Sequence, residues 1–236
     1  LEAVANRVKR VATGWEPLFT IAMDSVIARD PMLDLVGAFY ALEPPTRLKL
    51  RDETLLGTVE ALASGEADLA VGSVLDASSL SFTAPGIHTR PLGELRFVYA
   101  VAPHHPLARL PQPLSDATLR NHRAVAAADS SRAGPTMNVN LIGGQDVLTV
   151  PTMQAKLAAQ LHGLGSGFLP EALARPYIEA GHLVELQTER VRPVGQMHLA
   201  WRVRSPARPG RALEWWLARF EHEGTRRALL EQHRGR

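Results

Sequence analysis

The sequence of 236 residues predicts an α/β protein built from two lobes. One observation is that short strand-like runs alternate with amphipathic helical patterns, an order that favours a mainly parallel sheet. A second is that this alternation starts again at residues 97–103, a long apolar run that indicates a second α/β unit. Two such units joined by two long strands enclose a cleft, and clefts between lobes usually bind small ligands.

The first unit is predicted from the spacing of apolar residues. Leu48 and Leu50 alternate with polar neighbours, a period of two that is typical of a strand. Leu55 and Val59 lie on one helical face, and Gly65 follows where that helix should end. The expected elements are strands at 18–23, 47–52 and 67–72 and helices at 33–40 and 53–65.

The second unit repeats these signals. Met153, Leu157 and Leu161 recur every four residues, which predicts a helix. Residues 104–115 form a proline-punctuated loop, and the charged run at 226–236 is expected to be a solvated tail. The expected strands are at 97–103, 124–128, 147–150, 167–169 and 197–203, and the expected helices are at 151–163 and 211–224.

Composition excludes several classes of protein. The longest apolar stretches are shorter than the ~20 residues that span a bilayer, so we expect no membrane partner. Lys plus Arg is 26 against 24 Asp plus Glu, and the positive charge is scattered, so this chain by itself is a poor DNA binder. The absence of cysteine excludes thiolate zinc sites and cysteine nucleophiles.

The motifs of enzymes are missing. The segment GLGSGFLP at 163–170 is neither a GxSxG nucleophile elbow nor a GxGxxG fingerprint, and a tight helix-to-strand turn explains it better. His104 and His105 are adjacent but have no third metal ligand at workable spacing. We therefore predict no catalytic residue, no metal site and no cofactor.

Polar residues follow several predicted strands, at the strand ends where ligands bind in open α/β sheets. Each could also be a helix cap or a turn residue, but four groups from both lobes together predict a shared pocket. The groups are Asp24 and Ser25, Glu53 and Thr54, residues 129–132, and residues 152–154.

Three longer segments resemble a known family. ETLLGTVEALASGEADLAVG, RPLGELRFVYAVAPHHPLARL and VPTMQAKLAAQLHGLGSGFLPEALA are similar to the effector-binding half of a LysR-type transcriptional regulator. The ordered set is more specific than any single motif, and the resemblance covers nearly the whole chain. Its landmarks are Gly65, Asp68, Gly72, His105, Pro106, Leu107, Ala108, Gly163, Gly165, Leu169 and Pro170.

This resemblance implies a type 2 periplasmic-binding-protein fold, in which two Rossmann-like lobes are joined by two crossing strands. It places the tail of a linker helix at 1–14, lobe I at 15–96 and 204–236, and lobe II with the crossing strands at 97–203. It also implies a cytoplasmic bacterial regulator whose winged helix-turn-helix precedes residue 1, so that DNA is bound only through that missing domain. The expected assembly is a homodimer through helices 33–40 and 153–163, and a tetramer at full length.

The resemblance also implies where a small-molecule effector is contacted, namely at Asp24, Ser25, Thr54, Ser131 and Met153. Asp24 departs from the family, which often has a small or hydroxyl residue in that turn, and an acid there would disfavour a carboxylate lying directly against it. Two alternatives to an effector-sensing regulatory domain stay open: a periplasmic solute-binding protein with the same fold, and an enzyme on the same scaffold.

Overall fold

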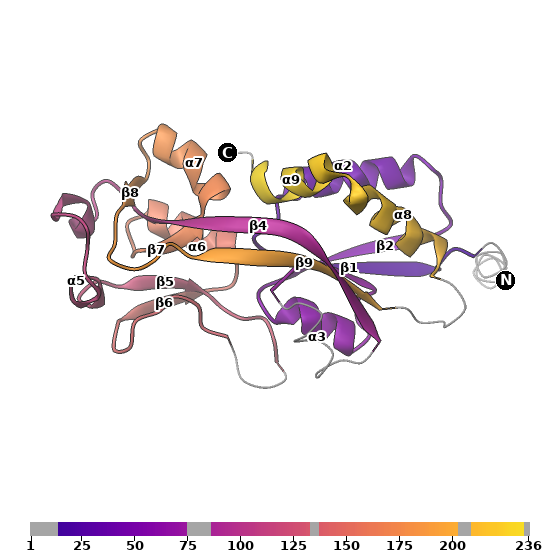
Figure 1. The fold of residues 1–236 in the computed structure, drawn as a ribbon, viewed down its shortest axis with the longest axis horizontal. Helices are drawn as coiled ribbons and strands as arrows, with labels where there is room; N and C mark the ends of the chain where they lie inside the picture. The colour runs from indigo at the N-terminus through magenta and orange to yellow at the C-terminus, as the bar shows by residue number, and fades with distance from the viewer. Residues whose placement is uncertain (1–13, 75–85, 133–136, 203–208, 234–236) are drawn as a thin grey trace.

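The computed structural model describes residues 14–74, 86–132, 137–202 and 209–233. The linker helix expected at 1–14 lies outside these residues except for Gly14. Two lobes lie end to end along the long axis, and two long strands connect them (Figure 1). These are β4 (Ile87–Val101) and β9 (Val194–Arg202), which pair with each other in antiparallel fashion.

Lobe I contains three parallel strands followed by β9. The seven-stranded sheet has the order β2-β1-β3-β9-β4-β7, and β8 pairs with β4 beside this path. β1 is parallel to both β2 and β3, as the sequence predicts, whereas β3 and β9 are antiparallel. The elements of lobe I are β1 (Leu18–Asp24), α2 (Arg29–Tyr40), β2 (Arg47–Glu53), α3 (Gly57–Ala63), β3 (Leu69–Ser73), α8 (Arg211–Glu221) and α9 (Glu223–Glu231).

Lobe II is built around the far end of β4. There β4 pairs with β7 and β8 in antiparallel fashion, while β5 and β6 form a separate parallel pair. Its elements are the 3₁₀ helix η1 (Pro106–Arg109), α5 (Asp116–Arg120), β5 (Ala124–Ala127), β6 (Val147–Val150), α6 (Met153–Leu161), β7 (Gly167–Pro170), α7 (Glu171–Glu179) and β8 (Val184–Leu186).

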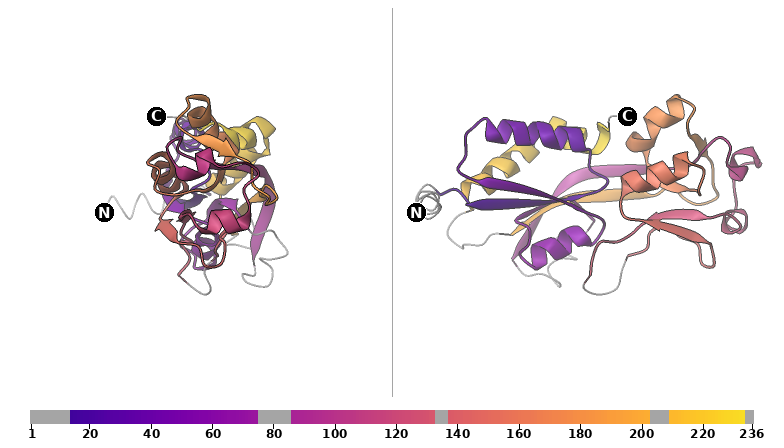
Figure 2. Two further views of the ribbon diagram at one scale, coloured as in Figure 1. Left: turned by 90° about the vertical axis from the view of Figure 1, so that its left-hand side faces the viewer. Right: turned by 180° about the vertical axis from the view of Figure 1, so that it is seen from behind.

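The core of lobe I follows from the two-residue period of β1. Ile21 and Met23 point into the large apolar cluster that includes Trp216, whereas Ala22 belongs to a smaller cluster with Leu62 of α3. Figures 1 and 2 show the corresponding layers, with α2, α8 and α9 on one face of the sheet and α3 on the other. Burial on both faces explains why β1 and β3 are apolar almost throughout, whereas β2 at the edge of the sheet alternates apolar and charged residues.

The family landmarks have local structural reasons. The Asp68 carboxylate accepts a hydrogen bond from the backbone N–H of Thr20 at 2.8 Å, which ties the start of β3 to β1. Gly65 ends α3 with a φ of 77°, in the left-handed region that favours glycine. A Cβ on Gly165 would lie 2.7 Å from the Arg123 carbonyl oxygen, so the turn before β7 requires a residue without a side chain.

Several expectations from the sequence are wrong. The parallel pairing predicted for the first unit holds for β1, β2 and β3 only, and the sheet as a whole is mixed, because β4, β7, β8 and β9 all pair in antiparallel fashion. The run at 226–236 is not a solvated tail over its described part: α9 continues to Glu231, and Leu229 and Leu230 are buried. Arg226 is half-buried, and its guanidinium donates to the carbonyl oxygen of Phe220 at 2.9 Å. Within the described ranges, none of the helices has both the length and the apolarity that crossing a bilayer requires.

Candidate functional site

A small cavity lies where the two lobes meet, at the carboxyl ends of β1 and β2. Its volume is about 80 Å³. Asp24 and Thr54 line it from lobe I, and Met153 and Lys156 of α6 line it from lobe II. An engineered cavity of roughly 150 Å³ holds benzene. This arrangement, which we call closed because hydrogen bonds join the lobes, therefore has room for a ligand of only a few heavy atoms.

The walls of the cavity are mainly apolar, with polar groups at separate points. Phe97, Phe168 and Met197 contribute apolar surface, and the exposed residues Asn138 and Asn140 lie on the solvent side. A cavity of this kind, apolar with a few polar groups that converge on it, is typical of a small-molecule site.

A larger open groove of about 800 Å³ lies elsewhere, between α7, α9 and residues 92–96 of β4. Acidic and basic side chains alternate along it, and some are already paired, as Arg175 is with Glu171. It contains none of the residues that the resemblance implies as effector contacts. The cavity between the lobes is therefore the better candidate site.

Asp24, the acid that departs from the family, mainly organises backbone. Its Oδ1 accepts a hydrogen bond from the N–H of Val26 at 2.9 Å, and its Oδ2 accepts one from the N–H of Leu55 at 2.7 Å. Leu55 has a φ of 55°, a left-handed conformation that is uncommon for leucine. Burial raises the pKa of Asp24 to about 7, and the nearby carboxylates of Asp129 and Glu53 add to the effect of burial.

Ser25 and Thr54 connect the two lobes directly. The Ser25 Oγ accepts a hydrogen bond from the N–H of Met153, the first residue of α6, at 3.2 Å. The Thr54 hydroxyl lies 3.2 Å from both Ser25 Oγ and the carbonyl oxygen of Pro151. The side-chain amide of Gln154 donates to the Ser25 carbonyl at 2.8 Å. The Ser25 and Thr54 hydroxyls, which are expected to contact an effector, therefore form hydrogen bonds between the lobes instead.

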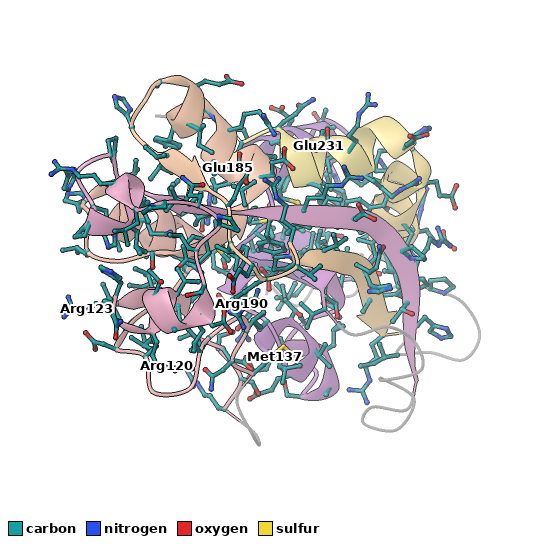
Figure 3. The ribbon with its side chains drawn as sticks, turned by 60° about the vertical axis from the view of Figure 1, so that its left-hand side comes forward. Arg120, Arg123, Met137, Glu185, Arg190 and Glu231 are labelled. Carbon is teal, nitrogen blue, oxygen red and sulfur yellow. The ribbon has the colours of Figure 1, made fainter. Side chains whose placement is uncertain are left out.

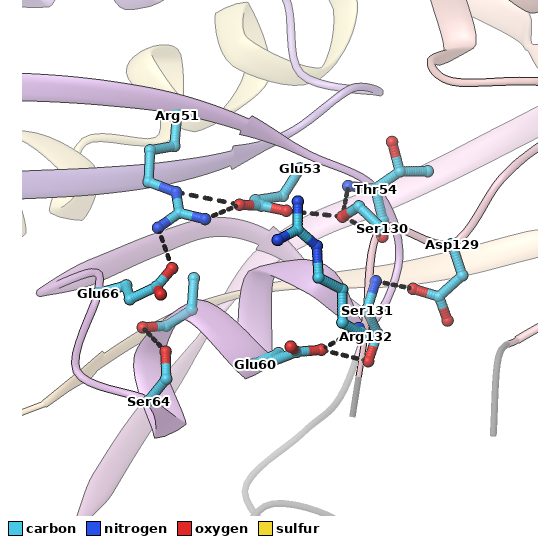
Figure 4. A network of polar contacts seen from close by, with 11 residues as sticks. Arg51, Glu53, Thr54, Glu60, Ser64, Glu66, Asp129, Ser130, Ser131 and Arg132 are labelled. Carbon is cyan, nitrogen blue, oxygen red and sulfur yellow. Dashed lines mark hydrogen bonds and ion pairs between the residues drawn. The ribbon is translucent and has the colours of Figure 1, made fainter. Parts of the chain in front are cut away.

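Ser131 belongs to a polar network beside the cavity rather than to its lining. Its hydroxyl donates to the Glu60 carboxylate of α3, which also accepts the N–H of Arg132 (Figure 4). The neighbouring Ser130 hydroxyl donates to Glu53 Oε2 at 2.7 Å. The interlobe network, as we call Glu53, Thr54, Glu60 and residues 130–132, therefore joins α3 and the end of β2 to lobe II.

Lys156 is the site residue that the sequence reasoning missed. Its side chain lines the cavity, and burial lowers its pKa to about 8. Lys156 lies three residues after Met153, on the same face of α6, where neighbours at helical spacing meet. That spacing is the signal that the sequence offers. A lysine in an apolar stripe, however, usually buries its aliphatic stem and keeps its ammonium group in water.

The structure brings Asp24, Thr54 and Met153 together around the cavity and places Ser25 directly behind them, while Ser131 lies apart. Among the described residues, no three His, Cys, Asp or Glu side chains are grouped as metal ligands would be. The Nδ1 of His105 instead accepts the backbone N–H of Leu107 at 3.2 Å, which caps η1.

Two α/β lobes joined by crossing strands, with a cavity between them lined from both, define a two-lobed ligand-receptor domain. Comparison with known proteins gives its family. Residues 12–224 match the LysR substrate binding domain, and the chain belongs to that family.

Similar curated proteins are transcription regulators. The chain is 33% identical to the uncharacterized HTH-type transcriptional regulator YeeY of Escherichia coli, over 86% of this chain and 63% of that protein. It is 32% identical to the probable regulator YhaJ of the same organism, over 92% of this chain and 70% of YhaJ. The chain thus spans less than two thirds of the length of YeeY.

Solved structures support the fold. Full-length LysG from Corynebacterium glutamicum matches with a TM-score of 0.66 and 22% identity, over 98% of this chain and 73% of LysG. A second LysG structure, with the effector Arg bound, has the same TM-score. The predicted fold class is confirmed, and the regulators among the relatives favour a regulatory domain over the periplasmic solute-binding alternative.

Proposed function

We propose that this chain senses a small-molecule effector in the cavity between its lobes and passes the bound state to a DNA-binding oligomer. The observation that carries this proposal is the cavity itself, whose walls come from both lobes at the strand ends. A ligand held there contacts both lobes at once, so its binding free energy depends on how the lobes are arranged. The effector arginine in the LysG structure supports this use of the fold.

The effector would act on lobe closure. The interlobe network and the hydrogen bond from Met153 to Ser25 already join the lobes in the closed arrangement. An effector that fits the cavity adds contacts to this arrangement and raises its population, whereas a larger one favours a more open arrangement. Typical coupling free energies between two such sites are about 1–3 kcal/mol, which is enough to change the behaviour of an attached domain.

Regulation would also need a DNA-binding domain and an oligomer. DNA would be bound by a winged helix-turn-helix domain outside this chain, in the bacterial cytoplasm, and this domain itself would catalyse no reaction. We propose a homodimer, and a tetramer at full length, in which α2 of one copy meets α6 of the other. Leu33 and Tyr40 of α2 are about half exposed, which supports a partner on that face.

A screen by thermal shift tests the proposed function. Small acids, aromatic compounds and amines would be added to the purified chain, because a ligand at 100 times its dissociation constant stabilises by about 2.7 kcal/mol. Ala127→Leu should abolish the shift, since Ala127 lines the cavity and a larger side chain fills it. Ala180→Leu, at an exposed position, is the control. Ligands that stabilise Ala127→Leu as strongly as the wild type would place the site elsewhere.

A further inference from the structure

Lys156 is unusual among the cationic residues of the chain. Only 8% of its surface is exposed, and its ammonium group forms no hydrogen bond or ion pair with any described residue. The arginines that form ion pairs are all more exposed than this lysine. Burying an unpaired charge is costly, and proteins ordinarily offset that cost with a counter-charge.

The ammonium group lies close to the backbone of β7. A Cβ on Gly167 of β7 would lie 3.3 Å from Lys156 Nζ, tighter than most side-chain contacts. Glycine at that position leaves room for the end of the lysine beside the cavity. A narrow second cavity, of about 10 Å³, extends from Lys156 to Arg190. Arg190 bonds to the Asn140 carbonyl at 2.9 Å and pairs with Asp116 at 3.3 Å, so a second cation borders this side of the site (Figure 3).

The acid in the same cavity does not neutralise Lys156. Asp24 is the carboxyl group among the residues that line it, and the two side chains form no ion pair. Both Asp24 oxygens accept backbone N–H groups in lobe I. Because burial raises the pKa of Asp24 to about 7, this acid carries only part of a negative charge near neutral pH. It therefore opposes an anion in the cavity less than the sequence suggests.

We infer that Lys156 is the anion-binding residue of the cavity, and that the effector is a small carboxylate whose negative group pairs with its ammonium. The inference rests on the proposed function, since it names the chemical class of ligand for the same site. The cavity volume of about 80 Å³ limits the ligand in the closed arrangement to a few heavy atoms. The amides of Asn138 and Asn140 border the site and can contact the rest of the ligand.

Matched carboxylates and neutral amides test the inference. Acetate, glycolate, pyruvate and succinate, each up to about 100 mM at constant ionic strength, would be compared with acetamide by thermal shift and calorimetric titration. We expect at least one carboxylate to stabilise the wild type more than acetamide does. Lys156→Met should weaken its binding by about 10- to 100-fold, the effect of losing a charged partner. Lys49→Met removes the same charge from an exposed position and should bind as the wild type does.

Equal binding of the carboxylates by wild type and Lys156→Met would overturn the inference, as would no preference for any carboxylate over acetamide. Lys156→Gln keeps a polar group there and should show the same loss, which separates charge from shape. If a neutral or cationic compound from the screen binds the wild type and fails with Ala127→Leu, the inference fails and the proposed function stands. If no compound of any class distinguishes Ala127→Leu from the wild type, both fail.

Discussion

Replacing Lys156 by methionine should make the unliganded domain more stable. Methionine has nearly the volume of lysine without its charge, so packing around Gly167 and Phe168 is kept while the unpaired ammonium is removed. The fall of the Lys156 pKa from 10.5 to about 8 measures how strongly the folded protein disfavours the charged form. At about 1.4 kcal/mol for each tenfold change, the expected gain in the free energy of unfolding at pH 7 is about 3 kcal/mol.

The pH dependence of the free energy of unfolding distinguishes the loss of the charge from a change in packing. Between pH 8 and 10.5 the unfolded chain binds more protons at Lys156 than the native protein does, so native stability rises with pH there. Below pH 8 the penalty is fully present, because both states carry the charge. The advantage of Lys156→Met should therefore be constant from pH 6 to about 7.5 and nearly vanish by about pH 10.5.

Urea unfolding followed by circular dichroism measures both quantities. The wild type, Lys156→Met and Lys49→Met would be compared at several pH values, and differences between variants cancel the titration of other groups. Lys49→Met should change stability little at any pH, because its side chain is exposed. A Lys156→Met variant that is less stable than the wild type at pH 7, or whose advantage does not shrink at high pH, would refute this reasoning.

Four further outcomes follow from the site and the surface. Wild-type stability should fall as the pH rises from about 4 to 7, because over this range Asp24 binds more protons in the native state than in the unfolded state. Asp24→Asn should lack this fall in urea titrations. Ser131→Ala should lower the free energy of unfolding by roughly 0.5–1.5 kcal/mol by calorimetry, through loss of its bond to Glu60, and an unchanged value would remove it from the interlobe network. Leu33→Glu should turn a dimer into a ~26 kDa monomer in light scattering, and a wild type that is only monomeric at high micromolar concentration would contradict the proposed dimer. In gel shifts at physiological salt, the isolated chain should show no sequence-selective binding to duplex DNA.

The sequence predicted those elements whose burial follows a simple period. β1, β2, β3 and α6 are found close to their expected bounds, because each places its apolar residues on a regular face. The sequence does not predict α7, because Pro176 lies inside this helix and its buried surface is small. β4 starts ten residues earlier than the apolar run, because its first part is only half-buried and reads as a polar segment.

The candidate site was predictable only in part. Polar residues at strand ends indicated Asp24, Ser25 and Thr54, because strand order determines which ends meet. The partners of these residues were not predictable, since they depend on how the lobes face each other. Ser131 bonds to Glu60 rather than lining the cavity, and Lys156 is buried with its ammonium group against Gly167 of β7. The partner of Ser131 and the burial of Lys156 both depend on tertiary contacts, which no local sequence pattern specifies.

The crossing of β4 and β9 limits how the molecule can deform. The two strands pair from Ile87 and Arg202 to Arg96 and Val194, and the register shifts once, between Pro91 and Gly93. Continuous pairing prevents one strand from sliding past the other, so the lobes can move mainly by bending and twisting this two-stranded ribbon. A register shift of this kind bends a strand and increases its local twist. A small change of angle in the ribbon near Gly93 would therefore displace the far ends of both lobes by a larger distance.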